Sequence, residues 1–206
     1  MARYTESKCK QCLREHQKLY LKGAKCYSQK CVFTKRNGSL PGSNRYSYRR
    51  QSDFSVQFRE KQKIKRIYGL LEKQFKRYYE IAQNQTGDTG YNLLQVLERR
   101  FDNIVYRMGY APNRVAARQL VNHGHFMING KGNNIPSTLL KENDEIEVKL
   151  KSSKGEYFKD PLLGVDLNIP EWIEVSGTKG KVISFPQKEF FDPSMQPNLV
   201  VELYSR

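Results

Sequence analysis

No cysteine follows Cys31 in this chain of 206 residues, although four cysteines occur up to that point. No apolar run approaches the roughly 18 residues that a membrane-spanning helix requires, so we expect no segment that spans a membrane. The opening stretch MARYTESKCK contains no hydrophobic segment, so we expect no signal peptide. A chain without an export signal meets a reducing compartment, where structural disulfides are rare, which weakens a disulfide role for the thiols.

Acidic residues are scarce relative to basic ones. Lys and Arg number 36 against 21 Asp and Glu, which gives a formal charge of +15. This surplus predicts a polyanionic partner, either nucleic acid or an anionic membrane surface. Hydrophobic residues still make up 38% of the chain, so it can build a core and is not a disordered basic tail. The 13 tyrosines, interleaved with cations, suit stacking on RNA, although a tyrosine is more often a half-buried core residue.

The N-terminal half is predicted to be basic and mainly helical. Residues 1–51 show neither a helical nor a strand period and end in a run of cations, so we expect an extended, basic arm. Residues 52–95 are expected to form a helical N-terminal domain, in which residues 53–83 show the apolar stripe of an amphipathic helix. The stripe consists of Ile64, Ile67, Tyr68, Leu71, Phe75 and Tyr78. The cations on roughly the opposite face are Lys65, Arg66, Lys73, Lys76 and Arg77. Few acids share that face, which favours phosphate contact at least as much as solvation.

Residues 96–160 are predicted to combine helices with short strands. We expect a helix from Tyr91 to Met108, with Thr89 as its N-cap and Gly109 as its end. A second helix over 114–123 has Asn113 as its N-cap and ends at Gly124. A hairpin that turns at 129–130 and a strand over 144–150 follow. Residues 151–170 are a polar linker. Residues 161–195 are expected to form a β extension with a hairpin that turns at Gly177–Gly180. The tail 196–206 is compatible with a strand or a helix, and its apolar spacing favours a helix, which we expect to pack back on the helical N-terminal domain. The fold class is α+β.

The cysteines follow the spacing C-x2-C, a loop, then C-x4-C: Cys9, Cys12, Cys26 and Cys31. Paired thiols of this spacing are typical of a structural zinc site with four cysteine ligands. Such a closed site leaves no open position for catalysis, and it orders a segment with little core of its own. An iron–sulfur cluster, free thiols or a disulfide pair remain as alternatives. His16 lies inside the loop, and we expect it to be solvated.

The segment 97–148 predicts a compact face for RNA. Arg99 and Arg100 lie on the first expected helix, Arg114 and Arg118 on the second. Cations from two packed helices can contact phosphates together, and the neighbouring hairpin adds Lys131. Asn122 and His123 follow at the end of the second helix. His123 and His125 lie on a turn without a further ligand, which favours an RNA-facing or structural role over a metal pair.

The stretches RRFDNIVYRMG, ARQLVNHGHFMINGK, NNIPS and NDEIEV resemble the S-four RNA-binding module. The stretches MARYT, SDFSVQFREKQKIKRIYGLLEKQFKRYYE, TGYNLLQVLERR, PEWIEV and LVVELYSR make nearly the whole chain similar to the small-subunit ribosomal protein four family of the bacterial type, in its cysteine-bearing version. The resemblance implies a metal-knotted, mainly helical N-terminal domain and an S-four module with a small antiparallel sheet.

The resemblance also implies a cytoplasmic, non-enzymatic constituent of the small ribosomal subunit. Such a protein is a primary binder of small-subunit (16S-type) ribosomal RNA, nucleates assembly of the subunit body and contributes to translational accuracy. Its partners are ribosomal protein five of the same subunit and messenger RNA at the channel by which the messenger enters. The candidate RNA-binding residues are Arg45, Arg49, Arg50, Arg59, Lys63, Lys65, Arg66, Lys73, Lys76, Arg77, Arg99, Arg100, Arg114, Arg118, Asn122, His123 and Lys131.

Two positions depart from the family pattern. The family usually reads Pro-Gly-Gln-His-Gly where this chain has PGSNR at 41–45, so the family role of residues 43–45 is not carried over, although the added cation keeps the basic character. Asn143 stands where the family often has Gly, and Asn tolerates the left-handed conformation that such a turn needs.

Two other classes of protein explain the chain less well. An RNA-modifying or aminoacylating enzyme carrying this module needs a separate catalytic domain. The chain has no phosphate-cradling glycine loop, no carboxylate constellation and no Cys/His pair outside the cysteine cluster. A zinc-dependent DNA-binding regulator needs a recognition helix beside the metal, yet residues 9–31 show no sustained amphipathic period.

Overall fold

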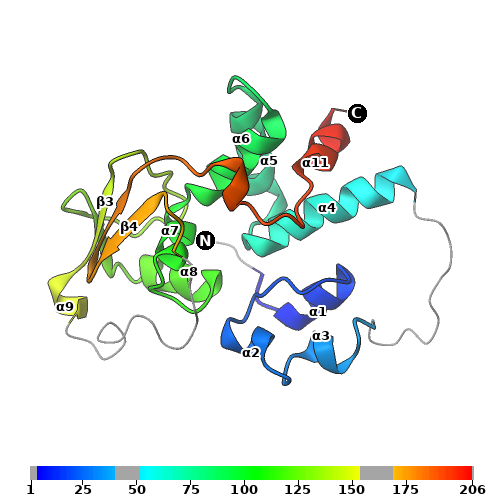
Figure 1. Cartoon of the computed structure of the whole chain (residues 1–206), viewed down its shortest axis with the longest axis horizontal. Helices are drawn as coiled ribbons and strands as arrows, with labels where there is room; N and C mark the ends of the chain where they lie inside the picture. Colours follow the sequence, from blue (N-terminus) through cyan, green and yellow to red (C-terminus); the bar gives the residue numbers. More distant parts are fainter. Residues whose placement is uncertain (1–3, 40–51, 154–168, 206) are drawn as a thin grey trace. The chain divides into compact units, whose positions relative to one another are not determined.

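The computed structural model describes residues 4–39, 52–153 and 169–205, which fold into two compact units (Figure 1). Unit 1 comprises Met1–Leu93 with Asp192–Arg206, and unit 2 comprises Leu94–Phe191. The candidates Arg45, Arg49 and Arg50 lie outside the described residues, as does most of the expected linker over 151–170.

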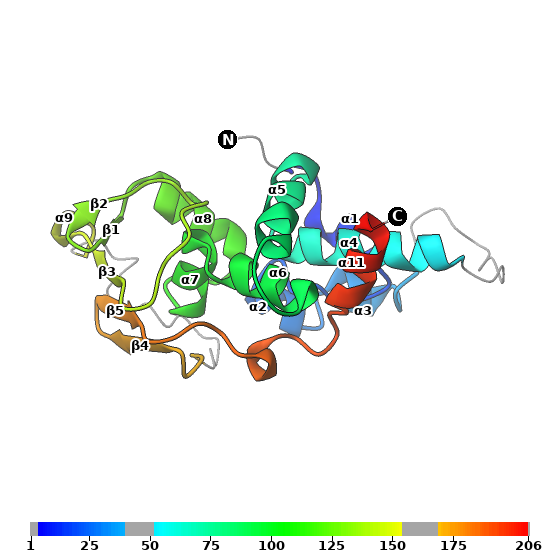
Figure 2. The same cartoon turned by 90° about the horizontal axis from the view of Figure 1, so that it is seen from above.

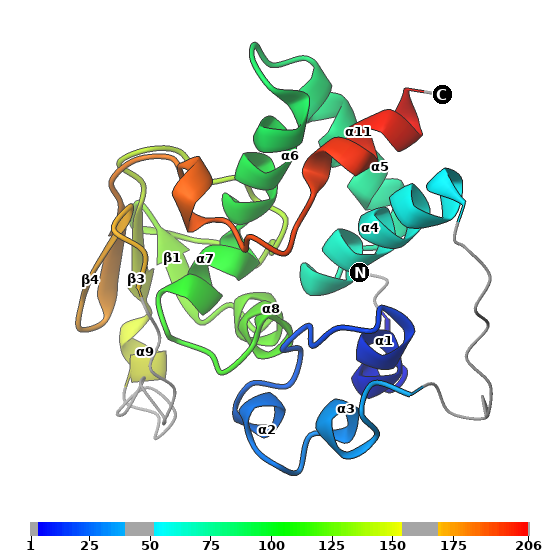
Figure 3. The ribbon, with the colours of Figure 1, turned by 45° about the vertical axis from the view of Figure 1, so that its right-hand side comes forward.

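The N-terminal arm contains three short helices: α1 (Lys8–Arg14), α2 (Ala24–Tyr27) and α3 (Val32–Lys35), drawn in blue in Figure 3. The expectation of an extended arm without helices was therefore wrong for this part. Helices of four to seven residues are too short to display a repeating apolar stripe, so the sequence pattern does not reveal them. Leu13, Leu19 and Leu21 are buried here and supply a small local core.

The region 53–83, expected to be one helix, is two helices, α4 (Asp53–Ile67) and α5 (Glu72–Gln83). Gly69 lies between them with φ of 62°, a left-handed conformation that glycine adopts without steric penalty and that ends an α-helix. The predicted stripe is otherwise buried, except that Leu71 precedes α5 and is 40% exposed.

The C-terminal helix α11 (Pro197–Tyr204) was predicted, and it packs on α4 (Figure 2). Gln57 of α4 donates a hydrogen bond to Glu202 over 2.8 Å. The ring of Tyr204 stacks on Tyr79 of α5 with centroids 4.5 Å apart, and Val200 is fully buried. The chain's last helix thus completes the core of unit 1.

The helix expected from Tyr91 to Met108 is also broken, into α6 (Thr89–Glu98) and α7 (Phe101–Arg107). The break at Arg99 and Arg100 arises because the loop 136–140 takes over the backbone hydrogen bonds. The N–H groups of Phe101 and Asp102 donate to the carbonyls of Thr138 and Pro136. Thr89 is the first helical residue rather than the cap, since the carboxylate of Asp88 accepts from the N–H of Gly90. Gly109, with φ of 82°, follows α7 as predicted.

Helix α8 (Arg114–Asn122) confirms the predicted cap and stop. The side chain of Asn113 accepts hydrogen bonds from the N–H groups of Val115 and Ala116, over 3.1 and 2.9 Å. Gly124 follows with φ of 74°. This cap fixes where α8 begins, and so where its arginines lie.

Unit 2 contains a five-stranded antiparallel sheet in the order β2-β1-β3-β5-β4. The strands are β1 (Phe126–Ile128), β2 (Lys131–Gly132), β3 (Glu145–Val148), β4 (Ile173–Ser176) and β5 (Lys179–Val182). Both predicted hairpins are present. The first turns at Asn129 and Gly130, both with positive φ, and the second at Gly177 and Thr178. Asn143 has φ of 66°, as its turn requires.

The strand expected over 144–150 ends at Val148, and a short helix α9 (Leu150–Ser153) follows. A 3₁₀ turn, η1 (Lys188–Phe190), lies near the end of unit 2. Helices α7 and α8 and the sheet share one apolar core, which includes Phe101, Ile104, Phe126 and Trp172. None of the helices in the described ranges combines the length and apolarity that crossing a bilayer requires.

Candidate RNA interface

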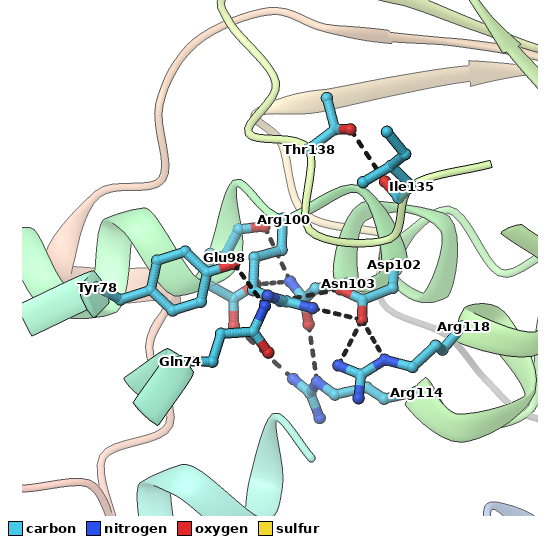
Figure 4. Close-up of polar contacts among 10 residues, drawn as sticks. All are labelled: Gln74, Tyr78, Glu98, Arg100, Asp102, Asn103, Arg114, Arg118, Ile135 and Thr138. Carbon is cyan, nitrogen blue, oxygen red and sulfur yellow. Dashed lines mark hydrogen bonds and ion pairs between the residues drawn. The ribbon is translucent and has the colours of Figure 1, made fainter. Parts of the chain in front are cut away.

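Two buried carboxylates, Glu98 and Asp102, organise arginines of α7 and α8, and Figure 4 shows the two carboxylates with Arg114 and Arg118 of α8. Glu98 ends α6 and its side chain is 2% exposed, and Asp102 lies in the first turn of α7 and is 5% exposed. Glu98 accepts from Nε and Nη2 of Arg107 over 2.9 and 2.8 Å. Asp102 accepts from Nε of Arg118 over 2.7 Å. Buried charges persist only when they are paired and hydrogen-bonded, so each carboxylate fixes the orientation of its guanidinium groups.

Asn103 connects the Glu98 centre to α8. Its amide donates to Oε2 of Glu98 over 2.7 Å, and its carbonyl oxygen accepts from Nε of Arg114 over 2.7 Å. The guanidinium of Arg114 also lies 4.7 Å from the ring centroid of Tyr106. The side chains of Arg107, Arg114 and Arg118 are 25, 19 and 14% exposed. Three arginines are thus held in defined positions with part of each side chain at the surface.

Arg100 does not belong to this surface, which corrects its prediction as an RNA-binding residue. Its side chain is 1% exposed, and Nε and Nη2 both donate to Asp102, over 3.0 and 2.8 Å. Sequence spacing places Arg99 and Arg100 together, but the break between α6 and α7 turns Arg100 inward. Its role is to compensate the charge of Asp102.

Arg99 is half-buried and takes part in packing as well. Its Nε donates to the carbonyl of Leu140 over 3.0 Å, and its guanidinium lies 4.1 Å from the ring centroid of Phe185. Burial lowers the pKa of Arg99, while Glu142 and Asp144 oppose that shift. Arg99 therefore joins the end of α6 to Leu140, which lies before β3, and to Phe185, which lies after β5.

The end of α8 and the first hairpin present exposed polar groups: Asn122, His123 and Lys131. Sequence reasoning missed Lys149. Its Nζ lies beside two glycines, Gly124 after α8 and Gly132 in β2, which have no side chain to block it. A Cβ on Gly132 would meet it at 3.3 Å, and one on Gly124 at 3.6 Å. The only sequence signal for Lys149 was its place directly after β3.

The two neighbouring histidines contact each other in this region. The rings of His123 and His125 lie 5.9 Å apart, and Nδ1 of His125 lies 2.9 Å from Oγ of Ser152. Burial lowers the pKa of His125, and the nearby His123 and Lys149 lower it further. These effects favour the neutral form of His125.

In unit 1 the predicted cation face divides into two parts. On α4, Lys63 is buried and pairs with Glu60 over 2.7 Å, and Lys65 pairs with Glu72 over 2.8 Å. These ion pairs stabilise unit 1, and contact of the two lysines with phosphate stays a prediction. On α5, the three cations Lys73, Lys76 and Arg77 are exposed, and within the described ranges none of the three has an ion pair.

Glu15 ties the N-terminal arm to α4. Its side chain is 2% exposed and pairs with Arg59 over 3.4 Å and with Arg66. Burial raises the pKa of Glu15, and the charges of Arg66 and Arg59 offset only part of that rise. Arg59 and Arg66, also predicted to contact RNA, therefore hold the arm against the helical domain, and their side chains remain 27 and 22% exposed.

None of the four cysteines forms a disulfide. Cys12, Cys26 and Cys31 are buried and Cys9 is half-buried. Burial raises the pKa of Cys12, and the charges of Cys26, Cys9 and Cys31 raise it further. The N–H of Lys22 donates to Sγ of Cys26 over 3.3 Å. Among the described residues, however, no three His, Cys, Asp or Glu side chains converge closely enough to be counted as a metal site.

Cys31 differs from the other buried thiols. Burial acts to raise its pKa, but hydrogen bonds from the backbone N–H groups of Thr34 and Phe33 outweigh burial and lower it. A thiol with a lowered pKa is the one that most readily supplies a thiolate, the form that ligates metals.

Together these features define a structural, RNA-binding class of protein: a helical basic domain followed by an α-helix-plus-hairpin module with a fixed arginine surface. Comparison with known families agrees. Residues 3–98 match the Ribosomal protein S4/S9 N-terminal domain, and residues 99–146 match the S4 domain.

Full-length relatives identify the particular family. The chain is 49% identical to small ribosomal subunit protein uS4 of Thermoanaerobacter sp. (strain X514), and 50% identical to small ribosomal subunit protein uS4 of Clostridioides difficile (strain 630). Both alignments cover 100% of each chain. The chain belongs to the small ribosomal subunit protein uS4 family.

Proposed function

We propose that the chain is a structural constituent of the small ribosomal subunit, in the cytoplasm, and that it binds the ribosomal RNA of that subunit without enzymatic activity. The observation that carries this is the 49–50% identity over the full length to relatives named small ribosomal subunit protein uS4. The match of residues 99–146 to the S4 domain supports RNA as the ligand. The net charge of +15 suits the same partner.

Two kinds of cation suit two kinds of RNA contact. Arg107, Arg114 and Arg118 are held by buried acceptors, and an arginine whose orientation is fixed binds phosphate with little further loss of side-chain freedom. Lys73, Lys76 and Arg77 are exposed and suit a contact driven by neutralisation of phosphate charge. We expect the first set to set the register on RNA and the second to add affinity.

The finer part of the proposal concerns assembly and further partners. We propose that the protein is a primary binder that nucleates the subunit body, contributes to accuracy and contacts ribosomal protein five. The same proposal places Arg45, Arg49 and Arg50 beside incoming messenger RNA. It rests on family membership, because those residues lie outside the described ranges.

We also propose a structural zinc ion held by Cys9, Cys12, Cys26 and Cys31, with an iron–sulfur cluster as the alternative. The paired spacing, the burial of three thiols and the N–H donor from Lys22 to Cys26 support it. When bound, the ion cross-links the arm and carries no reaction. The four cysteines and their ion would thereby fix the positions of the neighbouring cations that contact RNA, namely Lys8, Lys10, Arg14, Lys25 and Lys30.

Sedimentation and salt titration test the RNA proposal. We expect the protein to co-sediment with small ribosomal subunits and to stay bound at high salt. For small-subunit ribosomal RNA alone, log K should fall against log salt with a slope of about 0.7–0.9 per phosphate contacted. Protein found only at the top of the gradient, or an affinity that does not change with salt, would refute the proposal.

A further inference from the structure

Two tyrosines of the N-terminal arm form a stacked pair that faces solvent. Tyr20 precedes α2 and Tyr27 ends it, and their ring centroids lie 4.9 Å apart at an interplanar angle of 30°. Tyr20 is 44% exposed and Tyr27 64% exposed. A tyrosine that serves the core is buried, as Tyr78 and Tyr79 are at 4 and 5%, so core packing does not account for the pair.

Tyr20, one ring of the stacked pair, has an unfavourable backbone conformation. Its φ is 50°, in the left-handed region that a bulky side chain rarely adopts. Such strain persists where the surrounding structure imposes it, and it concentrates at ligand sites. Here the turn between the two tyrosines is closed by the cysteine region. The N–H of Lys22 donates to Sγ of Cys26 over 3.3 Å, and the N–H of Cys26 donates to the carbonyl of Gly23 over 2.8 Å.

The charge around the pair points to the class of ligand. The sequence contains no Asp or Glu between Glu15 and Asp53, whereas Lys22 and Lys25 lie between the two tyrosines and are exposed. A purely apolar protein partner would gain nothing from these lysines. A single-stranded nucleic acid offers both a flat base for the rings and phosphates for the lysines.

We infer that Tyr20 and Tyr27 form a stacking surface for an unpaired nucleobase of RNA, with Lys22 and Lys25 contacting the adjoining phosphates. The inference rests on the proposed RNA binding and deepens it, because it assigns recognition of a single-stranded nucleotide to the arm. Stacking is independent of base identity, so the surface selects for an unpaired base and not for a sequence.

The test uses the full chain and two RNA probes of equal length and charge per strand. One is a single strand with 2-aminopurine at its centre, and the other is the same strand annealed to its complement. The variant Tyr27→Leu removes one ring at an exposed position, and Tyr27→Phe keeps it. We expect Tyr27→Leu to weaken single-strand binding by roughly 5- to 100-fold and to abolish quenching of the 2-aminopurine, with duplex binding unchanged.

Two controls separate stacking from charge and from folding. Tyr27→Phe should retain quenching and affinity, and Phe54→Leu, which removes a 55% exposed ring on α4, should leave the signal unchanged. If Tyr27→Leu binds the single strand as tightly as the wild type does, the stacking surface is overturned. If the wild type also shows a steep salt dependence in that case, RNA binding itself still stands. Absence of RNA binding in the wild type would instead overturn the proposed function.

Discussion

At the scale of single residues, two buried glutamates, Glu98 and Glu15, form ion pairs that fix the positions of neighbouring arginines. Glu98 lies inside unit 2 and accepts hydrogen bonds from Arg107 and Asn103. In a strongly basic chain, such an acid serves to neutralise and orient neighbouring arginines at the surface. The same logic explains Glu15 between Arg59 and Arg66.

Removing the charge of Glu98 should therefore destabilise unit 2. We expect Glu98→Gln to lower the free energy of unfolding by about 3 kcal/mol, because it leaves partly buried arginines without their counter-charge. Urea unfolding followed by the fluorescence of Trp172 measures this. Trp172 is the one tryptophan of the chain and lies buried in the core of unit 2.

Glu147→Gln is the matched control, since it is the same chemical change at an exposed pair. Glu147 pairs with Lys179, whose side chain is 68% exposed, so its loss should change the free energy of unfolding by less than about 1 kcal/mol. Equal effects of the two substitutions would contradict the role assigned to Glu98.

At the scale of elements, Glu72 joins three helices. It lies in the first turn of α5 and accepts from Lys61 and Lys65 of α4 over 2.7 and 2.8 Å, and from the hydroxyl of Tyr204 of α11 over 3.1 Å. Burial alone would raise the pKa of Glu72, but the lysine hydrogen bonds outweigh burial and lower the pKa to about 2. Ionised Glu72 therefore stabilises the folded state.

The stabilisation by Glu72 should depend on pH in a defined window. Because the pKa is lower in the folded state, the contribution is complete above about pH 4.5 and is lost as pH falls towards about 2. The difference in stability between wild type and Glu72→Gln, followed by helical circular dichroism, should shrink across that window. A difference that stays constant from neutral pH to pH 2 would contradict this linkage.

Element types were more predictable from sequence than element ends. The cap of α8 at Asn113 and the hairpin at Asn129–Gly130 were predicted correctly, because both depend on local chemistry that a short window contains. The break between α6 and α7 was missed, because carbonyls of residues 136 and 138 take the N–H groups of Asp102 and Phe101. A contact from so far along the chain leaves no trace in local periodicity.

At the scale of the whole molecule, the two units should respond separately to loss of the metal that we propose. We expect Cys9→Ser with Cys12→Ser to remove bound zinc or iron and to expose the arm, up to about residue 31, to hydrogen exchange. Unfolding of unit 2, followed by Trp172 fluorescence, should stay unchanged, because all four cysteines lie in unit 1. Wild-type protein purified under reducing conditions with neither zinc nor iron would contradict the metal.

The division into units illustrates a second limit of sequence reasoning. The C-terminal helix α11 belongs to the unit that the N-terminus begins, and Tyr204 completes the contact with Tyr79. Its apolar spacing predicted a helix that packs back on the helical domain. Only the fold shows that Tyr204 also reaches Glu72 and so helps to lock α5.

The sequence by itself determined the family, the basic character, the cysteine pattern and most helices and strands, because these depend on composition and on neighbours a few residues apart. Tertiary structure decided which cations are available. Arg100 and Lys63 became internal partners of Asp102 and Glu60, while Lys73 stayed exposed. Whether a cation meets a carboxylate or solvent depends on residues brought together by folding, and spacing along the chain does not encode that choice.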